Sequence, residues 1–168
     1  FTGTVVRPAT VCGYSKRLRL DLSVNILTTH AYFKNKITIF GGEQYRPNLN
    51  ILDMIEFYVQ ALKYDSKLIN GEIFNVGYEN LKIKEIASLV KKIVEKDFVT
   101  ETTPSNDNRS YRITSKKIAE KLGFNPKHTV EDAIRSLYQN FENKTVANPF
   151  ESDLFYNVQV MKKIYENK

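Results

Sequence analysis

The apolar residues of this chain follow two spacings, and the first is that of short β-strands. Residues 2–6, 37–40 and 72–76 are rich in β-branched and aromatic side chains, and proline or glycine follows each run closely. A fourth run of this kind covers residues 98–102. Because proline and glycine interrupt a sheet ladder, each run is predicted to be a separate strand with a defined end.

The second spacing is helical, with apolar residues recurring at intervals of three and four between the strands. Helices are predicted at residues 20–33, 53–63, 83–94, 118–122 and 130–141. Asp53 with Glu56, and Thr129 with Asp132, have the spacing of a capping box and mark two of the starts. After residue 143 the pattern weakens into a tail, residues 144–168, which is predicted to be partly helical.

Strands that alternate with helices predict an α/β fold. We expect residues 5–11 and 72–76 to be parallel strands of one sheet, with the helix at residues 53–63 as the crossover between them. No glycine-rich turn of the dinucleotide-binding type follows a predicted strand. The two strands are therefore expected to be late members of an incomplete Rossmann sheet, whose first strands would belong to roughly 150 preceding residues.

Composition places the chain among ordinary globular proteins, with 42% hydrophobic and 26% charged residues. No apolar run approaches the ~18 residues of a membrane span, and a single cysteine, Cys12, fits a reducing cytoplasm. His30 and His128 lie far apart in the sequence, so no metal site is expected. We therefore expect a cytoplasmic protein that binds no membrane and no metal.

The net charge of +6 leaves two kinds of anionic partner open. Nucleic acid binding would favour clustered basic residues between aromatic ones, whereas most lysines here are spread along the predicted outer faces of helices. A basic surface also suits a diphosphate ligand. We expect no nucleic acid partner, although charge alone does not decide the matter.

Three segments in a fixed order carry a resemblance to a known family. They are Arg-Pro-Ala-Thr-Val-Cys-Gly at residues 7–13, Phe-Gly-Gly at residues 40–42, and Arg-Pro-Asn-Leu-Asn-Ile-Leu-Asp at residues 46–53. In this order they resemble the C-terminal half of nucleotide-sugar epimerases and dehydratases, the extended short-chain dehydrogenase/reductases. The resemblance implies that residues 1–13 and 72–77 are late Rossmann strands and that the rest of residues 1–143 is mainly a substrate-binding subdomain.

The resemblance also implies a site for a nucleoside-diphosphate sugar and one edge of a site for NAD or NADP. The strand at residues 5–11 would end beside the nicotinamide, so Pro8 and Val11 are the candidate cofactor-binding residues. A purely structural role is the alternative for Pro8, which has no backbone N–H. Thr10 replaces an asparagine that touches the sugar nucleotide in many relatives. Asn25 matches an asparagine at a helix start that meets the diphosphate, although it also suits a plain structural turn.

At the nucleotide end, the resemblance implies three further substrate-binding residues. Phe40 matches an aromatic residue that packs near the base or ribose, with a role in the core as the alternative. Arg46 matches the arginine that grips the phosphates, for which its planar fork is suited. Arg109 lies where relatives place a second such arginine, with pairing to Asp107 as the alternative.

No catalytic residue is assigned within the chain. The family uses a tyrosine with a lysine four residues on, and Tyr32 with Lys36 and Tyr78 with Lys82 have this spacing. About one match is expected by chance, and both pairs follow the strand that the family's catalytic pair precedes. The chain is therefore expected to be the inactive substrate-binding portion of an NAD(P)-dependent epimerase or dehydratase whose full-length form is a homodimer. The alternative is a non-catalytic basic binding or scaffolding domain.

Overall fold

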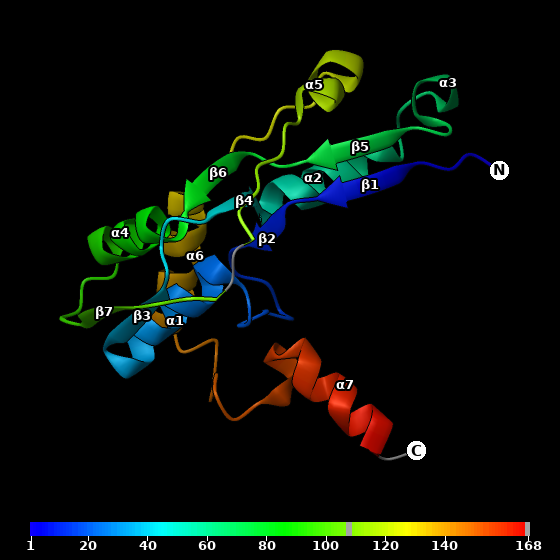
Figure 1. Cartoon of the computed structure of the whole chain (residues 1–168). Helices are drawn as coiled ribbons and strands as arrows, with labels where there is room; N and C mark the ends of the chain where they lie inside the picture. Colours follow the sequence, from blue (N-terminus) through cyan, green and yellow to red (C-terminus); the bar gives the residue numbers. More distant parts are fainter. Residues whose placement is uncertain (107–108, 167–168) are drawn as a thin grey trace.

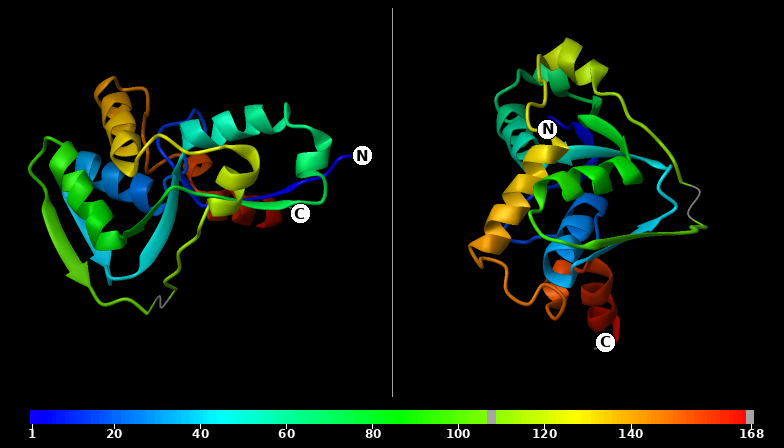
Figure 2. Two further views of the ribbon diagram at one scale, coloured as in Figure 1. Left: turned by 90° about the horizontal axis from the view of Figure 1, so that it is seen from above. Right: turned by 90° about the vertical axis from the view of Figure 1, so that its left-hand side faces the viewer.

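The structure is a computed structural model that describes residues 1–106 and 109–166. Its elements fall into two groups joined by a small central sheet (Figures 1 and 2). One group contains β1 (Val5–Pro8), β5 (Ile73–Val76), α2 (Ile51–Ala61) and α5 (Lys116–Leu122). The other contains β3 (Lys36–Phe40), β7 (Val99–Thr103), α1 (Ser23–Lys34), α4 (Ile83–Ile93) and α6 (Val130–Glu142). Strands pair mainly in parallel and helices cover them, so the predicted α/β fold class is confirmed.

The first sheet pairs β1 (Val5–Pro8) with β5 (Ile73–Val76) in parallel, with Val5 opposite Ile73. The expected parallel pairing of these two segments is confirmed, and α2 (Ile51–Ala61) lies in the connection between them. No strand among the described residues pairs with the other edge of β1. Phe57 of α2 and Phe74 of β5 lie in one buried core cluster.

The predicted strand at residues 5–11 is wrong in its extent, because the chain leaves the first sheet at Ala9. Residues beyond it form β2 (Thr10–Cys12), which belongs to a second sheet. In that sheet β2 lies parallel to β4 (Tyr45–Asn50), and β4 lies antiparallel to β6 (Glu79–Lys82). The sequence did not predict β4 or β6, because proline and asparagine are depleted in strands and β4 holds Pro47, Asn48 and Asn50.

The start predicted for the crossover helix at Asp53 is also wrong. Asn50 is the N-cap of α2, and its side-chain oxygen accepts a hydrogen bond from Leu52 N at 3.0 Å. Asp53 therefore lies one turn inside the helix, where it is completely buried. The apolar side of α2 is half-exposed or more, at Leu52, Ile55, Tyr58, Val59 and Leu62.

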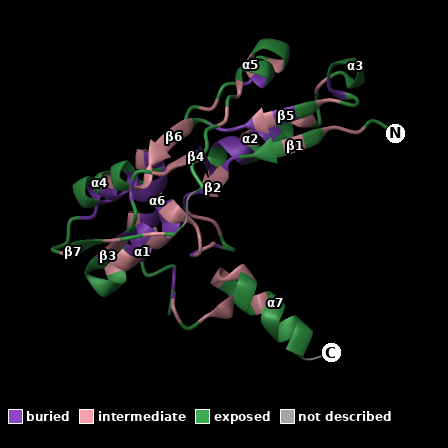
Figure 3. Cartoon of the chain, viewed as in Figure 1, coloured by how far each residue is buried: buried purple, intermediate pink, exposed green. Residues whose placement is uncertain are grey.

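The third sheet pairs β3 (Lys36–Phe40) in parallel with β7 (Val99–Thr103). Helices α1 (Ser23–Lys34) and α4 (Ile83–Ile93) pack against it, and α6 (Val130–Glu142) packs against these two helices, all within one core cluster. Thr129 and Asp132 form the predicted capping box at the start of α6, with mutual bonds of 2.8 and 3.1 Å. Figure 3 shows that burial is concentrated in these helices.

Two short helices and a terminal segment complete the chain. They are α3 (Ser66–Ile69), α5 (Lys116–Leu122), a 3-10 turn (Asp153–Phe155) and α7 (Asn157–Glu166). Gly123 ends α5 in the left-handed conformation, φ +68°. The terminal segment is attached to the loop before α1, because Leu20 N donates to Phe155 O at 3.0 Å. No helix in the described ranges is long and apolar enough to cross a membrane.

Candidate functional site

A cleft of about 510 Å³ opens where β1 and β2 meet the start of α1. Four of the residues singled out from the sequence line it: Pro8, Thr10, Val11 and Asn25. The break in the strand at Ala9 turns this stretch across the cleft, so Pro8 and Val11 lie on one wall. Gly13, with φ +103°, begins the loop that leads to α1.

Asn25 is buried and joins that loop to α1. Its side-chain oxygen accepts from Gly13 N at 3.0 Å, and its side-chain nitrogen donates to Arg19 O at 2.9 Å. It is only 2% exposed. The amide therefore joins two points of this loop beside the cleft, and the predicted contact of Asn25 with a diphosphate stays a prediction.

Two arginines of the same loop also line the first cleft, and sequence reasoning did not single them out. Arg19 makes a two-pronged ion pair with Asp21, with both bonds at 3.0 Å. Arg17 donates to the side chain of Asn157, the first residue of α7, at 2.8 Å. The signal available in the sequence was a pair of arginines at alternate positions in the loop that follows Gly13.

A second cleft of about 430 Å³ contains the other three predicted residues, Phe40, Arg46 and Arg109. Phe40 ends β3 and is 60% exposed, so the alternative that it is a core residue is wrong. Arg46 lies on β4, where its Nη1 donates to Tyr45 O at 3.0 Å and to Arg109 O. These bonds fix the guanidinium at the cleft wall beside Arg109. Asp107, the alternative partner of Arg109, lies outside the described residues.

The two clefts lie side by side along the first turn of α1. Leu22 and Asn25 line the first cleft, whereas Ser23 and Ile26 line the second. Residues 109–111 connect them from the other side, because Arg109 lines the second cleft and Tyr111 the first. The structure thus divides the predicted residues into two neighbouring groups, with four at the first cleft and three at the second.

His30 brings a titratable group to the second cleft. Burial, and then the charge of Lys34, lower the pKa of His30, so its imidazole is neutral at pH 7. Its ring centroid lies 5.5 Å from that of Phe150, over which Lys34 also lies at 4.0 Å. A neutral imidazole adds no charge to this cleft, which leaves its arginines as the groups suited to an anion.

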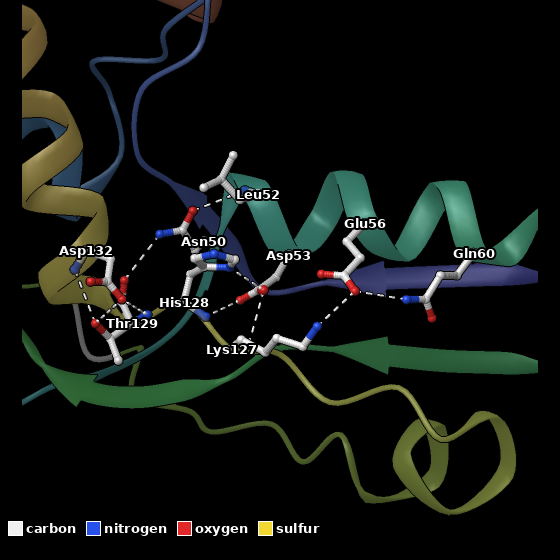
Figure 4. A network of polar contacts seen from close by, with 9 residues as sticks. All are labelled: Asn50, Leu52, Asp53, Glu56, Gln60, Lys127, His128, Thr129 and Asp132. Carbon is white, nitrogen blue, oxygen red and sulfur yellow. Dashed lines mark hydrogen bonds and ion pairs between the residues drawn. The ribbon is translucent and has the colours of Figure 1, made fainter.

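Asp53, one turn inside α2, holds the segment before α6 (Figure 4). Its carboxylate accepts from Lys127 N at 3.1 Å, from His128 N at 2.9 Å and from His128 Nδ1 at 2.7 Å. Asn50 adds a bond from its side-chain nitrogen to Thr129 O at 3.3 Å. Because every described contact of Asp53 joins two parts of the fold, this buried carboxylate is structural.

In both tyrosine–lysine pairs the lysine makes an ion pair with a glutamate. Burial raises the pKa of Tyr32 to about 12, with Glu142 adding to the effect. The cation over its ring is Lys96 at 3.5 Å, whereas Lys36 pairs with Glu101 at 2.8 Å. Lys82 likewise pairs with Glu43 at 2.8 Å. Burial also raises the pKa of the Cys12 thiol to about 12, which keeps the thiol protonated at neutral pH.

Comparison with known proteins identifies related chains, although no protein-family profile matches. The UDP-glucose 4-epimerase of Lactobacillus helveticus is 32% identical over 129 residues, which are 68% of this chain and 38% of that enzyme. Among solved structures, the UDP-glucuronic acid 4-epimerase of Bacillus cereus, in complex with UDP-glucuronic acid and NAD, superimposes with a TM-score of 0.72 and 26% identity. That match covers 84% of this chain and 45% of the neighbour.

A second structure confirms the fold alone. The UDP-glucose 4-epimerase of Thermotoga maritima, solved with UDP-glucose, gives a TM-score of 0.73 at 24% identity, and the match covers 87% of this chain and 48% of that one. The chain thus spans less than half the length of each of these three relatives. Sequence and fold together place the chain in the NAD-dependent nucleotide-sugar epimerase/dehydratase family.

Proposed function

We propose that this chain is the nucleotide-sugar-binding portion of an NAD(P)-dependent nucleoside-diphosphate-sugar epimerase or dehydratase. The observation that carries the proposal is the pair of adjoining clefts. Arg46 and Arg109 line one of them. The ends of β1 and β2 line the other, where Arg19 is paired with Asp21 and Arg17 is bound to Asn157. A nucleoside-diphosphate sugar has the same division, since its anionic nucleotide end and its neutral sugar end require different surroundings.

The second cleft would hold the nucleotide end. Arg46 and Arg109 present planar, permanently charged forks that suit phosphate oxygens, and Arg46 is already oriented by two backbone carbonyls. Phe40 offers an exposed aromatic face at the same cleft, against which a base or ribose would pack. A site oriented before the ligand arrives loses less entropy on binding.

The first cleft would hold the sugar. Thr10 provides a half-buried hydroxyl on its wall, and Asn25 would act through the loop that it holds rather than by touching the ligand with its engaged amide. The shorter side chain of Thr10 reaches less far than the asparagine of many relatives. We therefore expect Thr10 to contribute less to affinity than the arginines of the second cleft.

The chain fits one edge of the nicotinamide cofactor and no more. Pro8 and Val11 form an apolar wall of the first cleft, which suits contact with a flat ring and provides no group for a pyrophosphate. When bound, NAD or NADP would supply hydride exchange with the sugar. The residues that hold the cofactor phosphates and move the proton would come from another portion of the protein, so the chain alone would have no turnover.

Exposed apolar surface supports the proposal that a further portion exists. Ile55 and Tyr58 of α2 and Leu62, its C-cap, are 53%, 52% and 90% exposed. The outer edge of β1 has no strand partner among the described residues. Such surfaces are costly to leave in water, and a sheet edge readily accepts a further strand. A cytoplasmic homodimer with the missing Rossmann strands placed against β1 is the full-length form that we propose.

Calorimetry tests the proposal. The chain is titrated with UDP, CDP, GDP and dTDP, with the corresponding sugar nucleotides, and with a single-stranded oligonucleotide. We expect saturable binding of a nucleoside diphosphate, and no NADH absorbance when NAD and the sugar nucleotides are added. Arg46→Ala should lower the affinity for nucleoside diphosphate about 10- to 100-fold, because charge-assisted bonds of roughly 1.5–3 kcal/mol are lost. Arg46→Lys should restore only part of that affinity, because a point charge replaces a planar fork.

The matched control is Arg135→Ala. Arg135 lies on the outer side of α6 and pairs with Glu131 at 2.6 Å, away from both clefts. This variant should bind as the parent does. Binding of the oligonucleotide alone, or equal affinity of the parent and a folded Arg46→Ala chain, contradicts the proposed site.

A further inference from the structure

Residues 109–115, here named the crossing segment, connect the two clefts although they form no strand. The segment leaves the second cleft at Arg109, passes the first at Tyr111 and ends at α5 (Figure 1). Along this path it lies beside β4 and β6, the two neighbouring strands of the central sheet. Its position therefore determines where one residue of each cleft lies.

Side chains rather than a backbone ladder hold the far end of the crossing segment. The Asn80 side chain donates to Ile113 O and accepts from Ile113 N, with both bonds at 3.0 Å. Ser115 Oγ accepts from Gly77 N at 2.8 Å and donates to Gly77 O at 2.7 Å. Each side chain thus makes the pair of bonds that a neighbouring strand would otherwise make.

Packing at Gly77 leaves the crossing segment little freedom. A Cβ at that glycine would lie 2.5 Å from Ile113 Cδ1 and 3.1 Å from Ala9 Cβ. The Ile113 side chain therefore sits directly on the backbone where β5 ends, and Ala9 closes the other side. A Cβ at this position would force the end of the Ile113 side chain to move, so glycine permits this close approach.

The near end of the crossing segment is bound to β4. Ser110 Oγ accepts from Tyr45 N at 3.0 Å, and the Arg112 guanidinium lies 3.7 Å from the centre of the Tyr45 ring. Arg46 binds the carbonyl of Arg109. The segment is thus held at both ends, and the two clamping side chains, Asn80 and Ser115, lie outside either cleft.

We infer that Asn80 is a positioning residue of the nucleotide site, because its amide fixes the crossing segment so that Arg109 stays at the second cleft. The inference rests on the proposed function. Asn80 does not line either cleft and acts only through the segment. Without its amide, both polar groups of the Ile113 backbone lose their partner. The segment that carries Arg109 is then held mainly at its β4 end, so ordering the rest of it costs part of the binding free energy.

A double-mutant cycle tests this role. Dissociation constants are measured by calorimetry for the parent, Asn80→Ala, Arg109→Ala and the double variant, with the nucleoside diphosphate that the parent binds most tightly among UDP, CDP, GDP and dTDP. We expect Asn80→Ala to weaken binding about 5- to 20-fold in the parent. In the Arg109→Ala chain the same change should alter affinity less than about 2-fold, since the residue it positions is gone.

Controls separate positioning from stability. Asn80→Asp keeps the acceptor for Ile113 N and should restore part of the affinity. Asn75→Ala removes a half-buried asparagine of β5 that makes no side-chain hydrogen bond with the described residues, and it should bind as the parent does. If Asn80→Ala does not fold, Ser115→Ala, which removes the second clamp, takes its place in the cycle.

The outcomes are distinct. If Asn80→Ala lowers the melting temperature but leaves the affinity for the nucleoside diphosphate unchanged, the positioning role is overturned and the proposed function stands. The positioning role is also overturned if Asn80→Ala weakens binding by the same factor in the parent and in the Arg109→Ala chain, because the effects of independent residues add. A parent chain that binds no nucleoside diphosphate overturns the proposed function and this inference together.

Discussion

The buried carboxylate of Asp53 allows a quantitative prediction of stability. Replacing it with asparagine keeps the shape of the side chain but changes one acceptor oxygen into an NH₂ donor. The carboxylate accepts three hydrogen bonds in all, two at Oδ1 and one at Oδ2. In either orientation of the amide, at least one N–H of residues 127–128 then faces another donor.

The smaller loss occurs when the new NH₂ takes the place of Oδ2, where only His128 N donates. One bond to a charged acceptor contributes about 1.5–3 kcal/mol, so Asp53→Asn should lower the free energy of unfolding by roughly 2–3 kcal/mol. Asp53→Ala removes all three of these hydrogen bonds at a buried position and should cost about 3–5 kcal/mol. Such losses are large beside the 5–15 kcal/mol by which domains are typically stable.

Urea unfolding followed by far-ultraviolet circular dichroism measures both changes. The chain has no tryptophan, so the helix signal is the more direct probe. Asp65→Asn is the matched control, because Asp65 makes a single exposed bond, to Lys67 N at 2.8 Å, and should change stability by less than about 1 kcal/mol. The free energy of unfolding of Asp53→Asn could instead lie within about 0.5 kcal/mol of the parent's, a difference comparable to the precision of such curves. In that case the network in Figure 4 does not hold α2 to the segment before α6.

Two further predictions follow from packing and charge. Gly77→Ala should destabilise the chain by about 1–3 kcal/mol, because its methyl group would overlap the end of the Ile113 side chain. The same variant should bind nucleoside diphosphate more weakly. A variant with the stability and affinity of the parent would contradict the tight packing of the crossing segment. Hydrogen bonds from Lys117 and Lys121 lower the pKa of Glu72 to about 2, from 4.5 when unfolded. The depressed pKa gives a stabilising contribution that is present above pH 4.5 and is lost as the pH falls towards 2. In acid unfolding, Glu72→Gln should therefore differ from the parent above pH 4.5 and converge with it near pH 2; a constant difference across this range contradicts the pairing.

The sequence predicted those elements whose local signals agree with their place in the fold. Helix α6 has both an apolar side and a capping box formed by Thr129 and Asp132, so its start was found correctly. Strand β4 was missed because Pro47 and two buried asparagines contradict strand propensity, and its neighbours in the sheet override that preference. Asp53 was mistaken for a cap because the capping spacing is present, whereas its real partners lie more than 70 residues away.

For the candidate site, too, sequence reasoning found some residues and missed others. Resemblance brought Arg46, Phe40 and Arg109 together in one cleft before their contacts were known. It gave no indication of Asn80 or Ser115, because the bonds that these side chains make to a distant backbone leave no periodic pattern in the sequence. Clamps of this kind depend on tertiary geometry alone.

The parallel pairing of β1 with β5 also has a consequence for how fast the chain folds. The pairing brings together segments 68 residues apart, as between Thr4 and Glu72, and no strand pair in the described sheets is a local hairpin. Closing a loop of that length costs roughly 4 kcal/mol of chain entropy before any strand contact forms. Topologies dominated by such non-local contacts fold in milliseconds to seconds or more slowly. Helices such as α4 and α6 would therefore form first, and the sheets, with the clefts between them, would assemble last.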